Sequence, residues 1–167
     1  MFKGRLETVA LFGGSFDPPH FGHKAVVEEA LKLLDIDKLV VVPTFLNPFK
    51  ISSHATPDER FLMSVEMFKS FSKVEVNKYE IEEKKSTPTA QTVKHFLQSY
   101  EVKYIIIGAD NLNAIDRWYN FEWLNKNVTW VIASRAGYSV KSDILRASIL
   151  LEVDADISST QIRNKKD

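Results

Sequence analysis

Short apolar segments alternate with segments of helical periodicity along most of this chain. The apolar segments are rich in β-branched residues and typical of buried strands, and they cover residues 9–12, 39–42, 74–76, 104–108 and 128–133. After the first of them, apolar residues recur at helical spacing and predict a helix over about residues 22–34. Pro43 ends the second strand and opens an irregular stretch that runs to His54.

Two further helices are predicted from their N-terminal signals. Thr56-Pro57-Asp58-Glu59 is a capping box with proline at the first helical position, and it predicts a helix to about residue 71. Thr87-Pro88 predicts a helix that begins in the same way and runs to about residue 100. The charged segment between them, residues 80–86, reads as a solvated loop.

Apolar strands that alternate with amphipathic helices are typical of a parallel sheet covered on both faces. We therefore expect an α/β fold, an open doubly wound (Rossmann-like) parallel sheet with helices on both faces. Ligands of such sheets bind in the crevice beyond the carboxyl ends of the strands. No internal repeat, low-complexity segment or linker divides the chain, so residues 1–167 are expected to form a single domain.

Composition narrows the class of protein. Lysine plus arginine equals aspartate plus glutamate, at 22 each, so no overall basic character points to nucleic acid. Cysteine is absent, which is compatible with a reducing compartment. Neither a signal-peptide core nor a membrane-length apolar run occurs. These features predict a soluble, cytoplasmic protein without nucleic-acid or membrane partners.

Candidate chemistry concentrates in residues 13–23, GGSFDPPHFGH, between the first predicted strand and the first predicted helix. Glycines at a strand end let the backbone approach a ligand closely, and the following helix directs unpaired N–H groups to the same place. His20 and His23, three residues apart, can donate to anionic oxygens. This arrangement predicts a phosphate-handling site.

This segment is also compatible with other chemistry. The two histidines could bind zinc, but there is no cysteine, and the remaining His54 and His95 show no ligand spacing. They could also cap the helix. A dinucleotide-binding dehydrogenase would need a G-x-G-x-x-G loop and an acidic residue after the second strand, where Val42-Pro43 stands instead. This argues against NAD as a redox cofactor.

The full string GGSFDPPHFGH closely resembles the G-G-[ST]-F-D-P-x-H-x-G-H signature of bacterial nicotinate-mononucleotide adenylyltransferases, of the HxGH nucleotidyltransferase superfamily. Residues 157–163, ISSTQIR, resemble the family's second motif, I-S-[SA]-[ST]-x-I-R. Residues 106–112 resemble its I-I-G-x-D-x-[LF] strand end, and residues 87–92 its [ST]-x-T-x-x-T segment. Residues 43–50 match a P-x-x-x-x-P-H-[KR] loop in which Asn47 and Phe49 depart from the usual residues. Pro88 also replaces a frequent tyrosine, and the chain ends four residues after Arg163.

The resemblance implies a nucleotidyltransferase fold and a role for each matching residue. The implied catalytic residues are His20, His23 and Arg163. The implied ATP-binding residues are Gly13, Gly14, Ser15, Phe16, Lys50, Gly108, Asp110, Ser158, Ser159 and Thr160. The implied mononucleotide-binding residues are Asp17, Thr89, Ala90, Trp118 and Tyr119. The resemblance implies that Trp118 stacks on the pyridine ring and that Thr89, Ala90 and Tyr119 surround its carboxylate.

The implied reaction joins nicotinate mononucleotide and ATP to give nicotinate adenine dinucleotide and pyrophosphate in NAD biosynthesis. Mg²⁺ is expected with ATP, held by phosphate oxygens and water and not by a dedicated protein cage. Two alternatives stay open. One is the same chemistry with another acceptor, nicotinamide mononucleotide or phosphopantetheine; the other is a non-catalytic nucleotide-binding module.

Overall fold

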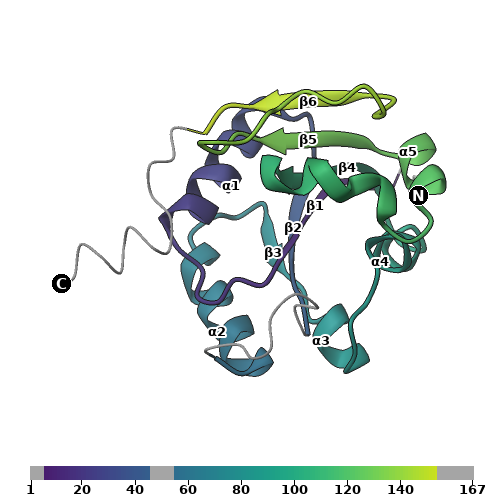
Figure 1. Cartoon of the computed structure of the whole chain (residues 1–167). Coiled ribbons are helices and arrows are strands. Elements are labelled where there is room, and N and C mark those ends of the chain that lie inside the picture. The colour runs from purple at the N-terminus through teal and green to yellow at the C-terminus, as the bar shows by residue number, and fades with distance from the viewer. Residues whose placement is uncertain (1–5, 46–54, 154–167) are drawn as a thin grey trace, which may run out of the picture.

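The structure, a computed structural model, describes residues 6–45 and 55–153. In these ranges six parallel strands form one sheet, in the order β3-β2-β1-β4-β5-β6 (Figure 1). The strands are β1 (Thr8–Gly14), β2 (Lys38–Pro43), β3 (Val74–Val76), β4 (Glu101–Gly108), β5 (Thr129–Ala133) and β6 (Ser148–Leu151). The expected α/β fold with a doubly wound parallel sheet is confirmed.

Helices cover both faces of this sheet. α1 (Phe21–Leu33) and α2 (Pro57–Phe68) pack on one face, and α4 (Thr89–Phe96) and α5 (Phe121–Asn127) pack on the other (Figure 1). The second face also carries α3 (Tyr79–Glu83) and the 3₁₀ helix η1 (Ala109–Arg117). None of the helices in the described ranges is long and apolar enough to cross a membrane.

Alternation along the strands builds two cores. In β1, Ala10 and Phe12 point to the face under α1, whereas Val9 and Leu11 point to the face under α4. Successive strand residues alternate in this way, so a strand buried on both sides must be apolar at every position. This requirement explains the continuous apolar runs in the sequence.

Several elements differ from the sequence-based prediction. β6, α5 and η1 were not predicted, because they are short or lack a strong period. The predicted solvated loop over residues 80–86 is wrong in its first half, where α3 forms and buries Glu80 and Ile81. α4 begins at Thr89 and has Pro88, not Thr87, at its N-cap position. It ends at Phe96, four residues early, since β4 already begins at Glu101.

The predicted capping box of α2 is confirmed. Thr56 Oγ1 accepts from the Glu59 N–H at 3.1 Å, and Glu59 Oε1 accepts from the Thr56 N–H at 2.9 Å. These reciprocal bonds satisfy two donors that a helix start leaves without partners. They fix where α2 begins, and so where its first turn directs Arg60.

The strand order reverses between β1 and β4. The chain winds outward from β1 through β2 to β3, then returns to the other side of β1 and continues through β4, β5 and β6. Loops that leave β1 and β4 therefore diverge to opposite faces and open a crevice at the carboxyl edge. Gly14 lies beside Pro43 and Phe12 beside Ile106 at this edge.

Arg60 of α2 is a buried cation that braces this edge. Its side chain is 1% exposed, and its two terminal nitrogens donate to the Ser15 carbonyl at 2.7 Å and to the Phe45 carbonyl at 2.9 Å. Burial lowers the pKa of the guanidinium, and the nearby charge of Asp17 opposes this effect. Arg60 thus ties the loop after β1 to the segment after β2.

We expect Arg60→Leu to lower the free energy of unfolding by about 2–4 kcal/mol, because two part-buried carbonyls lose the hydrogen bonds that they accept from the charged guanidinium. Urea unfolding followed by circular dichroism measures this loss. Lys69→Leu removes a cation just beyond the same helix, where the side chain is exposed, and should cost far less. An equal loss in both variants would show that Arg60 does not brace the loop.

Candidate active site

The loop after β1 turns sharply around a buried aromatic ring. Phe16 has a φ of 51°, in the left-handed region that a bulky residue rarely adopts. Its side chain is 1% exposed and packs edge-on against Phe12, with ring centroids 5.4 Å apart. A Cβ at Gly14 would lie 3.3 Å from the Phe16 ring, so glycine suits this position. Burial of the ring holds the loop in this conformation.

His20 and His23 form the start of α1. His20 is the N-cap, and its Nδ1 accepts from the Gly22 N–H at 3.0 Å. His23 Nδ1 accepts in turn from the His20 N–H at 3.0 Å. The two imidazole rings face one another with centroids 3.9 Å apart. The helix-capping interpretation of these histidines is therefore confirmed, and it leaves both Nε2 atoms uninvolved in the capping.

This hydrogen bonding sets the protonation of the rings. An Nδ1 that accepts a hydrogen bond carries no proton, so a neutral ring carries its proton on Nε2 as a donor. The pKa of His23 falls from 6.5 to about 3, chiefly because burial disfavours the charged ring, and further because His20 and Arg135 lie near. At neutral pH His23 is therefore an uncharged hydrogen-bond donor.

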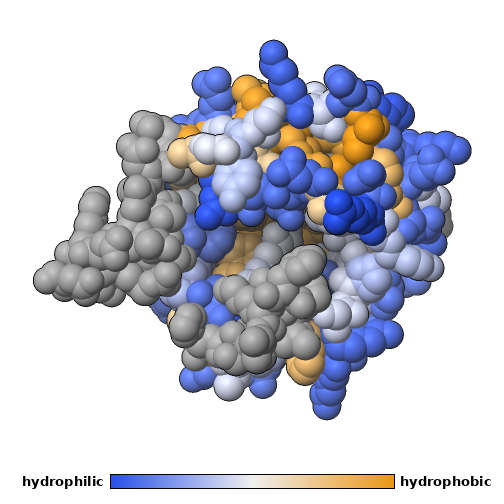
Figure 2. All heavy atoms as spheres, viewed as in Figure 1, coloured by the Kyte–Doolittle hydropathy of each residue, from blue (hydrophilic) through white to orange (hydrophobic). Residues whose placement is uncertain are grey.

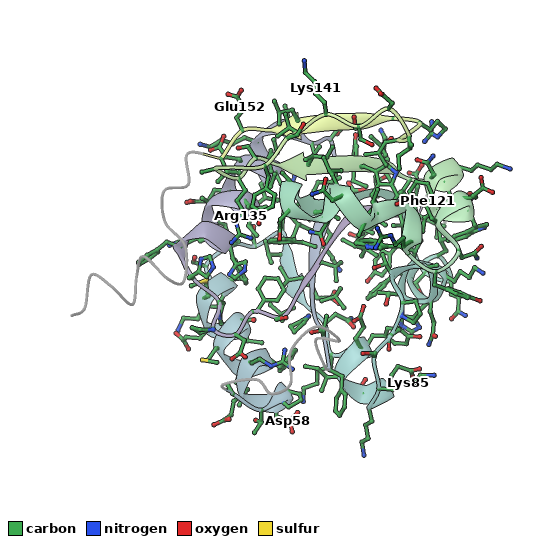
Figure 3. All side chains as sticks on the ribbon, in the orientation of Figure 1. Asp58, Lys85, Phe121, Arg135, Lys141 and Glu152 are labelled. Carbon is green, nitrogen blue, oxygen red and sulfur yellow. The ribbon has the colours of Figure 1, made fainter. Side chains whose placement is uncertain are left out.

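Arg135 supplies positive charge at this edge. It follows β5, and Figure 3 shows it between the end of β5 and α1. Its Nη1 lies 3.1 Å from Asp110 Oδ2, at the start of η1 after β4. A Cβ at Gly108 would lie 2.5 Å from Asp110 Oδ1, so any other residue at this position would displace the carboxylate. The pair connects the ends of β4 and β5.

A pocket of about 410 Å³ opens on the α4 face of the same edge. Its wall is apolar near the sheet, where Leu11, Val42 and Ile105 line it, and Trp118 lines it from the end of η1. Figure 2 shows a hollow near the centre of the molecule in this view, with hydrophobic residues in its floor. A flat, mostly apolar ring with a few polar substituents suits such a lining.

Glu80 and Thr92 are polar groups in the pocket wall. Glu80 is 6% exposed, and its Oε2 accepts from the Thr92 hydroxyl at 2.6 Å. Burial raises the pKa of Glu80 from 4.5 to about 7, and the hydrogen bond from Thr92 opposes this rise. The pocket thus contains a carboxyl group that changes charge near neutral pH.

The structure brings many of the predicted site residues to one edge of the sheet. Those that line the pocket are Gly13, Gly14, Ser15, Thr89, Gly108, Trp118 and Tyr119. His20, His23 and Asp110 lie outside the pocket lining, and the loop of Gly13, Gly14 and Ser15 connects the histidines to the pocket. Lys50, Ser158, Ser159, Thr160 and Arg163 lie outside the described residues.

Three predicted contacts are restricted by burial. The Phe16 side chain lies in the core, so Phe16 could meet ATP only through its backbone. Asp17 is 9% exposed, and its Oδ1 accepts from the Ala55 N–H at 3.1 Å, which places it in the bracing of the loop. Ala90 is fully buried and could offer a ligand only its N–H. Within the described ranges there is no group of three or more histidine, cysteine, aspartate or glutamate side chains that could hold a metal ion.

Three residues at this edge, Arg60, Arg135 and Glu80, were not predicted from the sequence to belong to the site. Arg135 follows a predicted strand, and the carboxyl ends of parallel strands share one edge, so its position after residue 133 was a usable signal. Glu80 stood in a charged segment that resembles a solvated loop, and Arg60 in an exposed-looking first helical turn. No local pattern indicated that these two side chains are buried.

Comparison with known proteins identifies relatives over nearly the whole chain. The cytidylyltransferase-like family model matches residues 11–165. A protein of Sulfurovum sp. (strain NBC37-1), named a probable nicotinate-nucleotide adenylyltransferase, is 52% identical over 95% of this chain and 85% of its own length. A protein of Campylobacter fetus with the same name is 42% identical over 96% of this chain and 87% of its own length.

Solved structures agree on the fold. The nicotinic acid mononucleotide adenylyltransferase of Plasmodium falciparum, complexed with NaAD, matches with a TM-score of 0.73 and 24% identity. The match covers 95% of this chain and 83% of that one. The same protein complexed with APC matches with a TM-score of 0.72 and 22% identity.

The depressed pKa of His23 predicts a pH dependence of stability. In the unfolded chain the ring gains a proton below pH 6.5, whereas in the fold it stays neutral to about pH 3. Its contribution is therefore present above pH 6.5 and is lost as the pH falls towards 3. His23→Gln keeps an acceptor suited to the third helical position but does not titrate.

Between pH 7 and pH 4 we expect wild type to lose about 3 kcal/mol more unfolding free energy than His23→Gln. Urea unfolding of both proteins across this range measures the difference. Parallel curves for the two proteins would contradict the assigned neutral state of His23.

Proposed function

The chain belongs to the cytidylyltransferase-like family, and within it we propose the activity of a nicotinate-nucleotide adenylyltransferase. It transfers the adenylyl group of ATP to nicotinate mononucleotide and forms nicotinate adenine dinucleotide and pyrophosphate. One observation carries the proposal beyond the likeness to relatives: the diglycine loop joins a pair of imidazole donors to an apolar pocket that has Trp118 in its wall. The imidazole donors suit phosphates, and the apolar pocket suits a pyridine ring.

The reaction needs no general base. A mononucleotide phosphate is already anionic at neutral pH, and one of its oxygens attacks the α-phosphorus of ATP. The new P–O bond forms as the bond to the bridging oxygen breaks, and pyrophosphate leaves with that electron pair. Repulsion between anions and misorientation make up the barrier, so catalysis consists of positioning and charge stabilisation.

His20 and His23 suit that task because their Nδ1 atoms are held by the helix start. Each neutral ring directs an Nε2–H donor, and donors fixed before the reaction stabilise developing charge without reorganising. Arg135 adds a full positive charge nearby, and an incoming phosphate would compete with Asp110 for its guanidinium. We propose Arg135 as a phosphate ligand on this ground.

The remaining assignments belong to the same proposal. Mg²⁺ would neutralise the ATP phosphates, held mainly by their oxygens and water, with Asp110 as an acceptor for a bound water. Ser159, Thr160 and Arg163 would hold the β- and γ-phosphates, with Lys50 and Ser158 beside them. Thr89, the Ala90 N–H and the Tyr119 N–H would bind the pyridine carboxylate. We also propose that the enzyme works in the cytoplasm.

Replacement of His23 separates catalysis from helix capping. We expect both His23→Ala and His23→Gln to lower kcat by about a hundredfold or more, with little change in KM for either substrate. Glutamine can still accept from the His20 N–H, so this variant should keep its start of α1. Steady-state kinetics and circular dichroism test both variants; near wild-type turnover in His23→Gln would refute the catalytic assignment.

Acceptor choice tests the pyridine site. We expect a kcat/KM for nicotinate mononucleotide about tenfold to over a hundredfold above that for nicotinamide mononucleotide. The start of α4 offers N–H donors, which form charge-assisted bonds with a carboxylate. An amide would leave donors unsatisfied, at about 1–3 kcal/mol each. Equal efficiencies, or a preference for the amide, would refute the assignment of Thr89, Ala90 and Tyr119.

A further inference from the structure

Glu80 is a buried carboxyl group that the proposed reaction does not use. It lies on α3 and lines the pocket together with Thr89, Trp118 and Tyr119, the residues assigned to the pyridine ring. Thr92, one helical turn after Thr89, donates its hydroxyl proton to Glu80 Oε2 at 2.6 Å. Both side chains are almost fully buried, at 6% and 3% exposure. Both side chains line the pocket, so a ligand in the pocket can contact them.

The charged neighbours of Glu80 are engaged elsewhere. On α3, Glu83 accepts from Gln91 at 3.0 Å, and Tyr79 stacks on His95 of α4 with centroids 3.8 Å apart. The other charged groups on neighbouring elements contact other residues or solvent. Lys94 of α4 lies over Trp123, Lys38 of β2 pairs with Glu75, and Lys78 before α3 lies over Phe61. The side chains of Glu82, Lys84 and Lys85 are exposed. In the described ranges no ion pair involves Glu80.

We propose that Glu80 recognises the substituent on the pyridine ring of the acceptor mononucleotide, so that the choice between an acid and an amide acceptor depends on the charge of the Glu80 side chain. The proposal rests on the proposed function. A protonated Glu80 can donate a hydrogen bond to the carboxylate of nicotinate. An ionised Glu80 repels that carboxylate and instead accepts from the NH₂ group of a carboxamide.

The charge of Glu80 changes near neutral pH. Burial raises its pKa to about 7, so both forms are present near neutral pH. Below this pH the protonated form favours the acid, and above it the ionised form penalises the acid. A like charge at short range weakens binding, and this effect falls on the acid alone.

Linkage gives a second consequence that needs no turnover. A carboxylate ligand beside Glu80 favours the protonated side chain and so raises its pKa further. Above pH 7, the binding of nicotinate mononucleotide must then be accompanied by the uptake of about one proton at Glu80. Nicotinamide mononucleotide has the same phosphate and ribose but no carboxylate, and should take up none at Glu80.

The first experiment measures kcat/KM for the two mononucleotides from pH 6 to pH 8.5. Their ratio cancels every titration that the two reactions share, including those of the phosphates and histidines. We expect the preference for nicotinate to fall about tenfold or more across this range in wild type. Glu80→Gln should show a flat ratio, whereas the control Glu82→Gln, an exposed position on the same helix, should follow wild type.

The second experiment measures proton uptake at pH 8 by calorimetry in buffers of different ionisation enthalpy. Wild type should bind nicotinate mononucleotide with about one proton more than nicotinamide mononucleotide, and the difference should vanish in Glu80→Gln. The wild-type measurement stands alone if that variant does not fold. Efficient turnover with a pH-independent ratio and equal proton uptake overturns the role of Glu80 only. Failure to form a dinucleotide from either mononucleotide overturns the proposed function itself.

Discussion

The hydrogen bonds by which the His20 and His23 rings cap the start of α1 determine what the phosphate side of the site can do. Each bond satisfies a helix N–H that would otherwise lack a partner, and each uses an imidazole nitrogen to do so. Since Nδ1 is occupied, the orientation and the tautomer of each ring are fixed before any ligand arrives. Burial keeps His23 neutral as well. Folding of the helix and preparation of the donors are therefore one event.

The loop before these histidines needs support from elsewhere, because its own conformation is unfavourable. A non-glycine residue at positive φ costs about 1–3 kcal/mol, and Phe16 is such a residue. The ring offsets this cost by packing in the core against Phe12 and His23. Arg60, anchored by the capping box of α2, donates a hydrogen bond to the Ser15 carbonyl of the loop from outside. An aromatic core contact and a buried cation together hold the diglycine segment at the edge of the sheet.

Much of this arrangement could be predicted from local sequence. The buried strands were predictable because burial on both faces requires apolar residues throughout, and the glycine–histidine segment because its spacing matches a chemical need. Glu80 and Arg60 were not predictable, since the burial of Glu80 depends on Thr92 of the following helix and that of Arg60 on the loop after β1, and neither contact belongs to a local sequence pattern. β6 was missed because an edge strand is solvated on one side, as the exposed Leu150 shows. Local patterns show which functional group a residue carries, whereas tertiary contacts determine whether that group is buried, exposed or placed in the site.

The imidazole pair and most of the pocket lie on opposite faces of the sheet, and the diglycine loop connects them. A substitution in α3 or α4 can therefore reshape the pocket while the helix start on the far face keeps its geometry. Such a division makes the fold evolvable: one half can retain an invariant chemistry while the other is retuned to a new acceptor by a few changes. Diversity among enzymes built this way should accumulate on the α3–α4 side of the sheet and be scarce around α1.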